Sequence, residues 1–128
     1  MDRSKILLAL AGLNGFMAVA VGAFGAHGVK IPAVQALLHT GSEYQALYAV
    51  SGLTCFNMVR TYGLSAPARS AGLLFGVGGL IFGCSLYILA ASGVKLWGAV
   101  TPIGGLMLLA GWAAVTWGAL GGDKTQKA

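Results

Sequence analysis

The chain has 128 residues, of which 57% are hydrophobic and only 9% are charged, and its mean hydropathy is +0.80. A soluble domain usually carries about 25% charged residues, so this composition excludes a water-facing globular protein and favours a chain that faces lipid, where charge is costly. The formal net charge of +5 comes from lysines and arginines that lie mostly near the ends of apolar segments. No basic stripe with interleaved aromatic residues is present, so nucleic-acid binding is not expected.

The apolar segments predict an all-α fold, a single domain of four transmembrane helices in a bundle. At about 20 residues per crossing, the chain accommodates helices at about residues 5–26, 44–62, 70–91 and 96–120. The charged start Asp2-Arg3-Ser4-Lys5 is similar to that of a secretory signal peptide. Because the apolar run after it exceeds 20 residues, we expect a retained span rather than a cleaved signal.

The first connection, residues 27–43, is longer than the others. Pro32 suits a first helical turn, and apolar residues follow at helical spacing. This pattern predicts a short amphipathic helix at about residues 32–42 that lies at the membrane surface. A loop is expected at residues 61–69 and a tight turn at residues 92–95.

Basic residues predict the orientation of the four crossings. The two termini and the loop at residues 61–69 would share one side, together with Arg3, Lys5, Arg60, Arg69, Lys124 and Lys127. The opposite side would hold only Lys30 and Lys95. Cytoplasmic loops carry the excess of Lys and Arg, so we expect a multi-pass protein of the cell inner membrane with both termini in the cytoplasm, the last as a soluble tail at residues 121–128.

Glycine accounts for 21 residues, and many glycines lie one helical turn apart. The candidate helix-packing residues are Gly22, Gly72, Gly76, Gly79 and Gly83. Small residues at positions i and i+4 let helix backbones approach closely in lipid. The favoured interpretation is packing within the bundle itself; the alternative is a face that docks a second copy or a partner.

Polar residues gather toward the non-cytoplasmic ends of the predicted helices. This candidate cluster consists of His27, Glu43, Gln45, Tyr87 and Thr101. Inward-facing residues at one depth of a narrow bundle must meet, so these five predict one hydrogen-bonded network. The network would either lock the helix ends, which we favour, or hold a ligand or ion. Two amides at mid-depth, Asn14 and Asn57, are expected to form hydrogen bonds between helices.

Residues with catalytic or metal-binding chemistry are scarce. His27, His39 and Glu43 could together bind a metal or relay a proton, but Glu43 is the only carboxylate expected near the membrane, so no acid–base pair exists. Cys55 and Cys84 lie in apolar runs without a CxxC or His-rich spacing, which favours two small buried side chains. We therefore expect no enzymatic activity, no cofactor and no metal.

Four stretches of the chain are distinctive when taken in order. They are Gly22-Ala23-Phe24-Gly25-Ala26-His27-Gly28, Glu43-Tyr44-Gln45, Gly83-Cys84-Ser85-Leu86-Tyr87, and Thr101-Pro102-Ile103-Gly104-Gly105 followed by Gly111-Trp112. Over nearly the whole chain they resemble the domain-of-unknown-function 423 family, which includes bacterial inner-membrane proteins and animal transmembrane-protein-256-like proteins. The family often has a histidine where this chain has Tyr48, so a role for that histidine does not carry over. The resemblance implies a small polytopic membrane protein and supplies no substrate, cofactor or catalytic residue.

Abundant packing signals beside scarce chemistry favour a non-enzymatic structural or accessory component. Such a protein would dock to itself, as a homo-oligomer, or to a larger membrane complex. The alternative is binding or transport of a small molecule, a lipid or an ion by the polar cluster. Its motivation is the convergence of polar residues together with Pro102, which should kink its helix and free a carbonyl. A cavity lined by Glu43, Tyr87 and Thr101 would favour this alternative.

Overall fold

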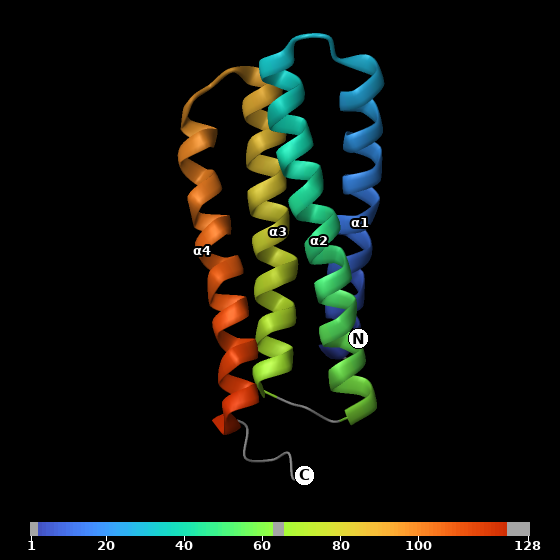
Figure 1. Ribbon diagram of the computed structural model, residues 1–128, viewed down its shortest axis with the longest axis vertical. Helices are drawn as coiled ribbons and strands as arrows, with labels where there is room; N and C mark the ends of the chain where they lie inside the picture. The colour runs from blue at the N-terminus through green and yellow to red at the C-terminus, as the bar shows by residue number, and fades with distance from the viewer. Residues whose placement is uncertain (1–2, 63–65, 123–128) are drawn as a thin grey trace.

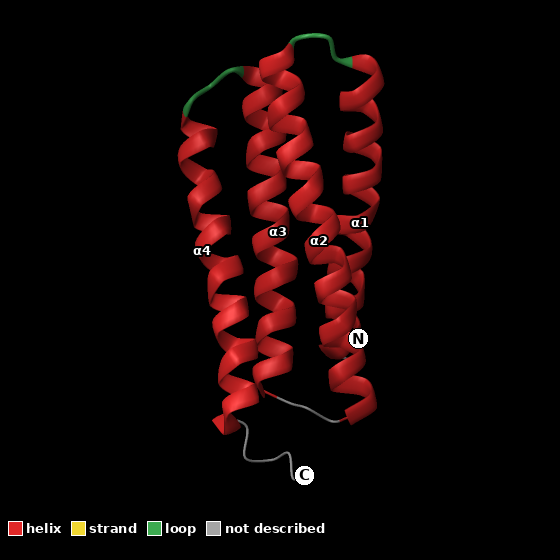
Figure 2. Ribbon diagram, in the orientation of Figure 1, coloured by secondary structure: helices red, strands yellow, loops and turns green. Residues whose placement is uncertain are grey.

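The computed structural model describes residues 3–62 and 66–122. Four helices lie side by side and alternate in direction (Figure 1): α1 (Arg3–Gly28), α2 (Pro32–Tyr62), α3 (Ala66–Ser92) and α4 (Leu96–Trp117), the last extended by the π-helical turn η1 (Gly118–Gly122). The described part of the chain is helical apart from short connections and contains no strand (Figure 2). The start of α1 and the end of α4 lie toward the same end of the bundle (Figure 1). The all-α fold is confirmed.

Local sequence accounts for the two turns at the opposite end. Between α1 and α2 only residues 29–31 are non-helical, and Pro32 begins α2 where its missing N–H costs no hydrogen bond. The N–H of Gln35 donates to the carbonyl of Ile31 over 3.0 Å, and the Gln35 side chain donates to the carbonyl of Val29. After α3, Gly93 adopts a φ of 70°, the left-handed conformation that commonly ends a helix.

Three of the described helices are long and apolar enough to cross a bilayer: Ser4–Gly28, Ala66–Ser92 and Leu96–Gly121. α2 is not among these three spans, because polar residues recur along it. With 31 residues at 1.5 Å each, α2 is nevertheless about 46 Å long, which exceeds the roughly 30 Å of a hydrocarbon core. Composition alone therefore identifies three candidate spans, and the fourth helix packs among them.

The separate amphipathic helix expected at residues 32–42 is not observed. α2 continues without a break from Pro32 to Tyr62, because nothing between the two predicted helices forces the backbone to turn. Gly41 and Ser42 are buried at this point rather than exposed in a bend. A Cβ at Gly41 would lie 2.5 Å from Cε1 of Tyr87, so Gly41 is where α3 closes on α2. Glycine here makes room for a ring instead of ending a helix.

The other predicted boundaries differ only slightly from the observed ones. α3 begins at Ala66 instead of residue 70, because Pro67 lies in the first turn, where proline is tolerated. η1 extends to Gly122, but Gly121 has a φ of 90°, which is not helical, so the regular helix ends before Gly121. The centre of the loop expected at residues 61–69 and most of the predicted tail lie outside the described residues.

α3 is the central helix of the bundle. It packs along α2 and α4 and contacts α1, whereas α1 packs mainly on α2 and the α4 backbone packs on α3 alone. The buried core between α2, α3 and α4 contains Tyr48, Cys55, Ala71, Phe75 and Leu108. Cys55 is buried and Cys84 is half-buried, and both thiols are free. The helices thus form one core around α3; the α4 backbone packs on α3 alone, and its side chains also contact α2.

Candidate functional site

A chain of hydrogen-bonded side chains joins α1, α2 and α3 inside the bundle. The hydroxyl of Tyr87 on α3 donates to Oε1 of Gln45 on α2 over 2.6 Å. Nε2 of Gln45 donates to Oδ1 of Asn14 on α1 over 2.9 Å. Nδ2 of Asn14 donates to the carbonyl of Gly76 on α3 over 3.0 Å and to that of Leu10 over 3.1 Å. We call Asn14, Gln45 and Tyr87 the amide chain; both amides are 0% exposed.

Glycines on α3 make the space that the amide chain occupies. A Cβ at Gly83 would lie 2.6 Å from Cδ of Gln45, and one at Gly79 would lie 3.0 Å from Oδ1 of Asn14. The next glycines along the same helix face residues of α1: a Cβ at Gly76 would lie 2.7 Å from Cβ of Leu10, and one at Gly72 would lie 2.9 Å from Cδ1 of Leu7. Gly22 on α1 is different, because a Cβ there would be only in ordinary contact with Ser42, 3.5 Å from its Oγ.

The amide chain carries no charge, and its buried polar atoms all have hydrogen-bond partners. Both N–H groups of Asn14 have carbonyl partners, and Nε2 of Gln45 also lies 3.7 Å from Sδ of Met17. Within residues 3–62 and 66–122, no buried side-chain nitrogen or oxygen lacks a hydrogen-bond partner. The arrangement can hold three helices in one register, since polar groups in lipid find partners on neighbouring helices.

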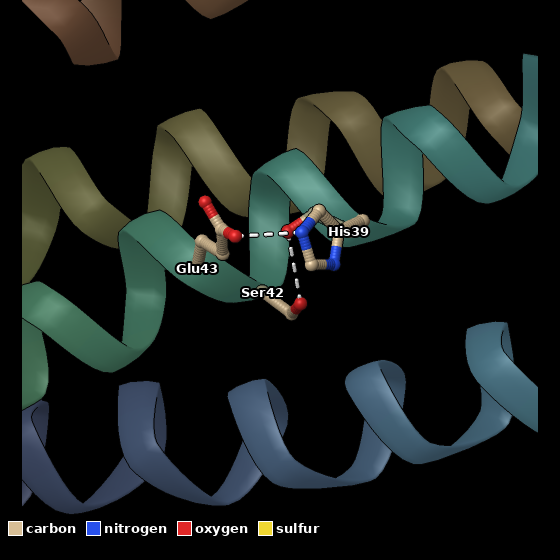
Figure 3. Close-up of polar contacts among 3 residues, drawn as sticks. All are labelled: His39, Ser42 and Glu43. Atoms are coloured by element: carbon tan, nitrogen blue, oxygen red, sulfur yellow. Dashed lines mark hydrogen bonds and ion pairs between the residues drawn. The ribbon is translucent and has the colours of Figure 1, made fainter.

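Glu43 lies outside this network. Its Oε1 is 2.6 Å from Nε2 of His39, one turn earlier on α2, and the two side chains are 63% and 73% exposed (Figure 3). Helix geometry explains the separation: Glu43 and Gln45 are two positions apart, about 200° around the helix axis, so they cannot both face the interior. An exposed pair of this kind contributes at most about 1 kcal/mol.

Two other members of the predicted cluster also have separate environments. Oγ1 of Thr101 on α4 lies 2.6 Å from Oγ of Ser85 on α3, and Ser85 also donates to the carbonyl of Phe82 over 2.9 Å. His27 is exposed at the end of α1 and has no hydrogen bond or ion pair with another described residue. The structure therefore brings together Gln45 and Tyr87 and leaves His27, Glu43 and Thr101 out of their network.

An aromatic cluster that sequence reasoning missed connects α2, α3 and α4. Nε1 of Trp112 donates to the hydroxyl of Tyr48 over 2.8 Å. Both rings contact Phe75, with centroid distances of 5.2 Å from Tyr48 and 4.8 Å from Trp112. One turn from Tyr48, Tyr44 stacks on Phe82 at 4.3 Å. The spacing of the aromatic residues in the sequence could have predicted this cluster: Tyr44 and Tyr48 are one turn apart on α2, and Phe75 and Phe82 are two turns apart on α3.

The amides at mid-depth have different surroundings. Asn14 joins three helices, but Asn57 is exposed on α2 and forms no hydrogen bond with another described residue. In the described part of the chain, no three His, Cys, Asp or Glu side chains lie close enough together to hold a metal ion. The histidines and Glu43 thus provide one exposed pair, His39–Glu43, and a separate His27.

Open grooves lie between helices on the bundle surface. One of about 370 Å³ lies between α1 and α2, and its walls include Gly22, Gly25, Gln35 and His39. Another of about 430 Å³ lies between α2 and α4, and its walls include Tyr44, Phe82 and Pro102. Neither groove is lined by Glu43, Tyr87 or Thr101. Neither is therefore the polar cavity that would have favoured binding or transport.

Comparison with known proteins places the chain in a family. The family model described as "Protein of unknown function (DUF423)" matches residues 21–105. The chain is 39% identical over 122 residues to the UPF0382 inner membrane protein YgdD of Escherichia coli (strain K12), with 91% of each chain covered. It is 33% identical over 115 residues to the UPF0382 membrane protein YwdK of Bacillus subtilis (strain 168), covering 87% of this chain and 93% of the relative.

A third relative, the UPF0382 membrane protein SSP2132 of Staphylococcus saprophyticus, is 36% identical over 110 residues, which cover 84% of this chain and 91% of the relative. No solved structure matches the chain. The names of these relatives and the three apolar spans of the chain both indicate a membrane protein. The four sequence motifs, the matching family model and the relatives together show that the chain belongs to the DUF423 family of membrane proteins, whose role is unknown.

Proposed function

We propose that the chain crosses the membrane four times with both termini in the cytoplasm. α2 is joined to α1 by three residues, 29–31, and lies between α1 and α3. If α1 and α3 cross the bilayer, α2 runs beside them through the same depth, and its polar side chains are tolerated where they face the bundle, as Gln45 does. The amides of Asn14 and Gln45 have their hydrogen-bond partners on α1, α2 and α3. This supports packing of α2 against protein at this depth rather than exposure of α2 to water.

The proposed role is that of a non-enzymatic structural or accessory component that docks to itself or to a larger membrane complex. The observation that carries this proposal is the contrast between the inside and the outside of the bundle. Inside, the amide chain is closed and offers no buried unpaired group to a substrate. Outside, large apolar side chains on α1 and α4 remain uncovered, including Phe16 at 74%, Val19 at 75% and Leu106 at 66% exposure. Such faces meet either lipid or another membrane helix.

Purification in a mild detergent, followed by mass measurement of the intact particle, tests the docking role. We expect either a homo-oligomer of fixed size or a second chain at fixed stoichiometry. Substituting tryptophan for Ala20, an exposed small residue on the face of α1, or for Ala110 on α4 should identify which face is used. A monomer without a partner, both in detergent and in lipid nanodiscs, would contradict the docking role.

The alternative of binding or transport through the outer polar cluster has less support. It required Glu43, Tyr87 and Thr101 to line one cavity, and these side chains have three separate environments: a surface pair with His39, the amide chain, and a contact with Ser85. The accessory role is therefore the function that this geometry supports best.

A further inference from the structure

The groove between α2 and α4 combines an apolar wall with one polar group that has no hydrogen-bond partner among the described residues. Phe82 of α3 lines its floor, Tyr44 lies on the α2 side, and Leu106 and Leu109 lie on the α4 side. The two leucines are each 66% exposed, and the backbones of α2 and α4 do not pack against each other. The groove is thus open to whatever surrounds α4, which in a membrane-spanning bundle is lipid.

The unpartnered group is the hydroxyl of Tyr44. Its ring is held by stacking on Phe82 at 4.3 Å, yet the hydroxyl forms no hydrogen bond with another described residue. Tyr44 is 40% exposed, so a molecule outside the protein can approach it. Where water is scarce, a hydroxyl without a hydrogen-bond partner costs free energy. An oxygen atom of a lipid could accept the hydrogen bond that this hydroxyl can donate.

A cationic residue lies above the groove along α4. Lys95 directly precedes α4 and is exposed. It lies seven residues before Pro102 in the groove wall, a rise of about 10 Å along a helix. In a bilayer, the headgroup layer adds roughly 5 to 8 Å outside each face of the hydrocarbon core. Along the bundle axis, starting from the end with the α3–α4 turn, the positive charge of Lys95 therefore comes first. Tyr44 and Pro102 follow, and Leu106 and Leu109 of α4 come last.

We propose that this groove holds one glycerophospholipid. Its phosphate would lie near Lys95, an ester carbonyl would accept a hydrogen bond from Tyr44, and one acyl chain would lie against Phe82, Leu106 and Leu109. The order of charge, donor and apolar surface along the groove matches the order of phosphate, ester and acyl chain in the lipid. This site is separate from the amide chain and does not depend on the accessory role.

Gly105 allows a sharp test, because it lines the groove and a Cβ there would be no closer than 4.0 Å to Phe82. Gly105→Leu should therefore fill the groove without displacing a helix. Gly12→Leu on α1 is the matched control, since a Cβ there meets nothing within 4 Å. Tyr44→Phe removes only the hydroxyl, and circular dichroism melting of each variant shows whether it is folded.

The probe is phosphatidylglycerol with a photoreactive diazirine in its acyl chain, in vesicles of phosphatidylethanolamine and phosphatidylglycerol. Peptide mass spectrometry should locate the adducts on the α2 and α4 segments that line the groove. Gly105→Leu should abolish these adducts and Gly12→Leu should leave them, while Tyr44→Phe should weaken lipid retention by about two- to tenfold, as expected for one hydrogen bond.

Lys95→Glu should remove any preference for phosphatidylglycerol over phosphatidylethanolamine, because it replaces attraction for the extra negative charge with repulsion. Three outcomes would overturn the proposal: adducts spread evenly over the outer faces of α1 and α4, groove adducts that persist in Gly105→Leu, or no lipid adduct at the groove of the parent chain. The last outcome would show that lipid does not occupy the groove, as when a second chain fills it.

Discussion

Gln45 donates a hydrogen bond from Nε2 to Oδ1 of Asn14 over 2.9 Å and so joins α2 to α1 through two side chains that are 0% exposed. Asn14 extends the connection to α3 by donating to the carbonyl of Gly76. In lipid no water replaces a lost partner, so removing either amide takes away the partner of one buried polar atom of the other. The pair fixes the rotation of three helices relative to one another.

Removing the Asn14 amide should destabilise the bundle. Asn14→Leu removes two hydrogen bonds between helices, and because such bonds average about 0.6 and reach about 1.7 kcal/mol each, we expect a loss of about 1 to 3 kcal/mol in the free energy of unfolding. Denaturation with sodium dodecyl sulfate, followed by circular dichroism, measures this loss. Asn57→Leu is the control, since Asn57 is exposed, and should change stability by less than about 0.5 kcal/mol. Equal losses in both variants would contradict the role given to Asn14.

Gly104 should be less tolerant of a methyl group than any exposed glycine. A Cβ at Gly104 would lie 2.6 Å from the backbone nitrogen of Phe82, and backbone cannot move aside as a side chain can. Gly104→Ala should therefore separate α3 from α4 and cost about 1 to 3 kcal/mol. Thermal melting in detergent measures the effect.

Gly12→Ala is the matched control for Gly104→Ala, because nothing lies within 4 Å of the added Cβ. It should be neutral or stabilising by up to about 1 kcal/mol, since alanine has the higher helix propensity. If both substitutions raised the melting temperature, α4 would not be packed on α3 as described.

The prediction of four helices from the sequence succeeded where the signal was an apolar run bounded by charge, as in α1 and α3. It failed between residues 42 and 44, where the residues before the apolar run were assigned to a separate surface helix, whereas α2 continues from Pro32 to Tyr62. The candidate cluster was chosen by depth in the membrane, which puts Glu43 and Gln45 together. Rotation about the helix axis separates them, and that rotation is fixed by contacts such as Gln45 against Gly83 that one sequence does not specify.

Substitution of Gln45 should destabilise the bundle more than substitution of Glu43. Glu43→Gln should change the free energy of unfolding by no more than about 1 kcal/mol, because its contact with His39 is on the surface. Gln45→Leu should cost about 1 to 3 kcal/mol, because it unpairs Oδ1 of Asn14 and the hydroxyl of Tyr87. Side-by-side detergent unfolding of the two variants decides this. A larger loss for Glu43→Gln would indicate that the carboxylate has a partner inside the bundle.

The Tyr48–Trp112 hydrogen bond should contribute a smaller amount. Tyr48→Phe keeps the ring against Phe75 but removes the oxygen that accepts from Nε1 of Trp112, so we expect a loss of about 1 kcal/mol and a changed tryptophan emission spectrum. Tyr62→Phe is the control, because Tyr62 is 66% exposed. An unaltered spectrum and melting temperature for Tyr48→Phe would show that Trp112 does not depend on this bond.

Cysteine labelling at positions 30, 95 and 125 tests the four crossings. We expect Lys30→Cys and Lys95→Cys to react with a membrane-impermeant maleimide in intact cells, and Thr125→Cys, which lies outside the described residues, to react only after permeabilisation. The parent chain corrects for reaction at Cys55 and Cys84, which are buried and half-buried.

The experiment distinguishes four crossings from three because the side of the membrane on which α3 begins depends on whether α2 crosses. If only the three most apolar helices crossed, α3 would begin outside, so position 95 would be cytoplasmic and position 125 external. Arg60 and Arg69 would then also be external, against the excess of positive charge expected inside. Labelling of position 30 is the same in both arrangements and serves as the internal standard. Reaction at position 125 without permeabilisation, together with protection at position 95, would remove α2 from the membrane and overturn the proposed topology.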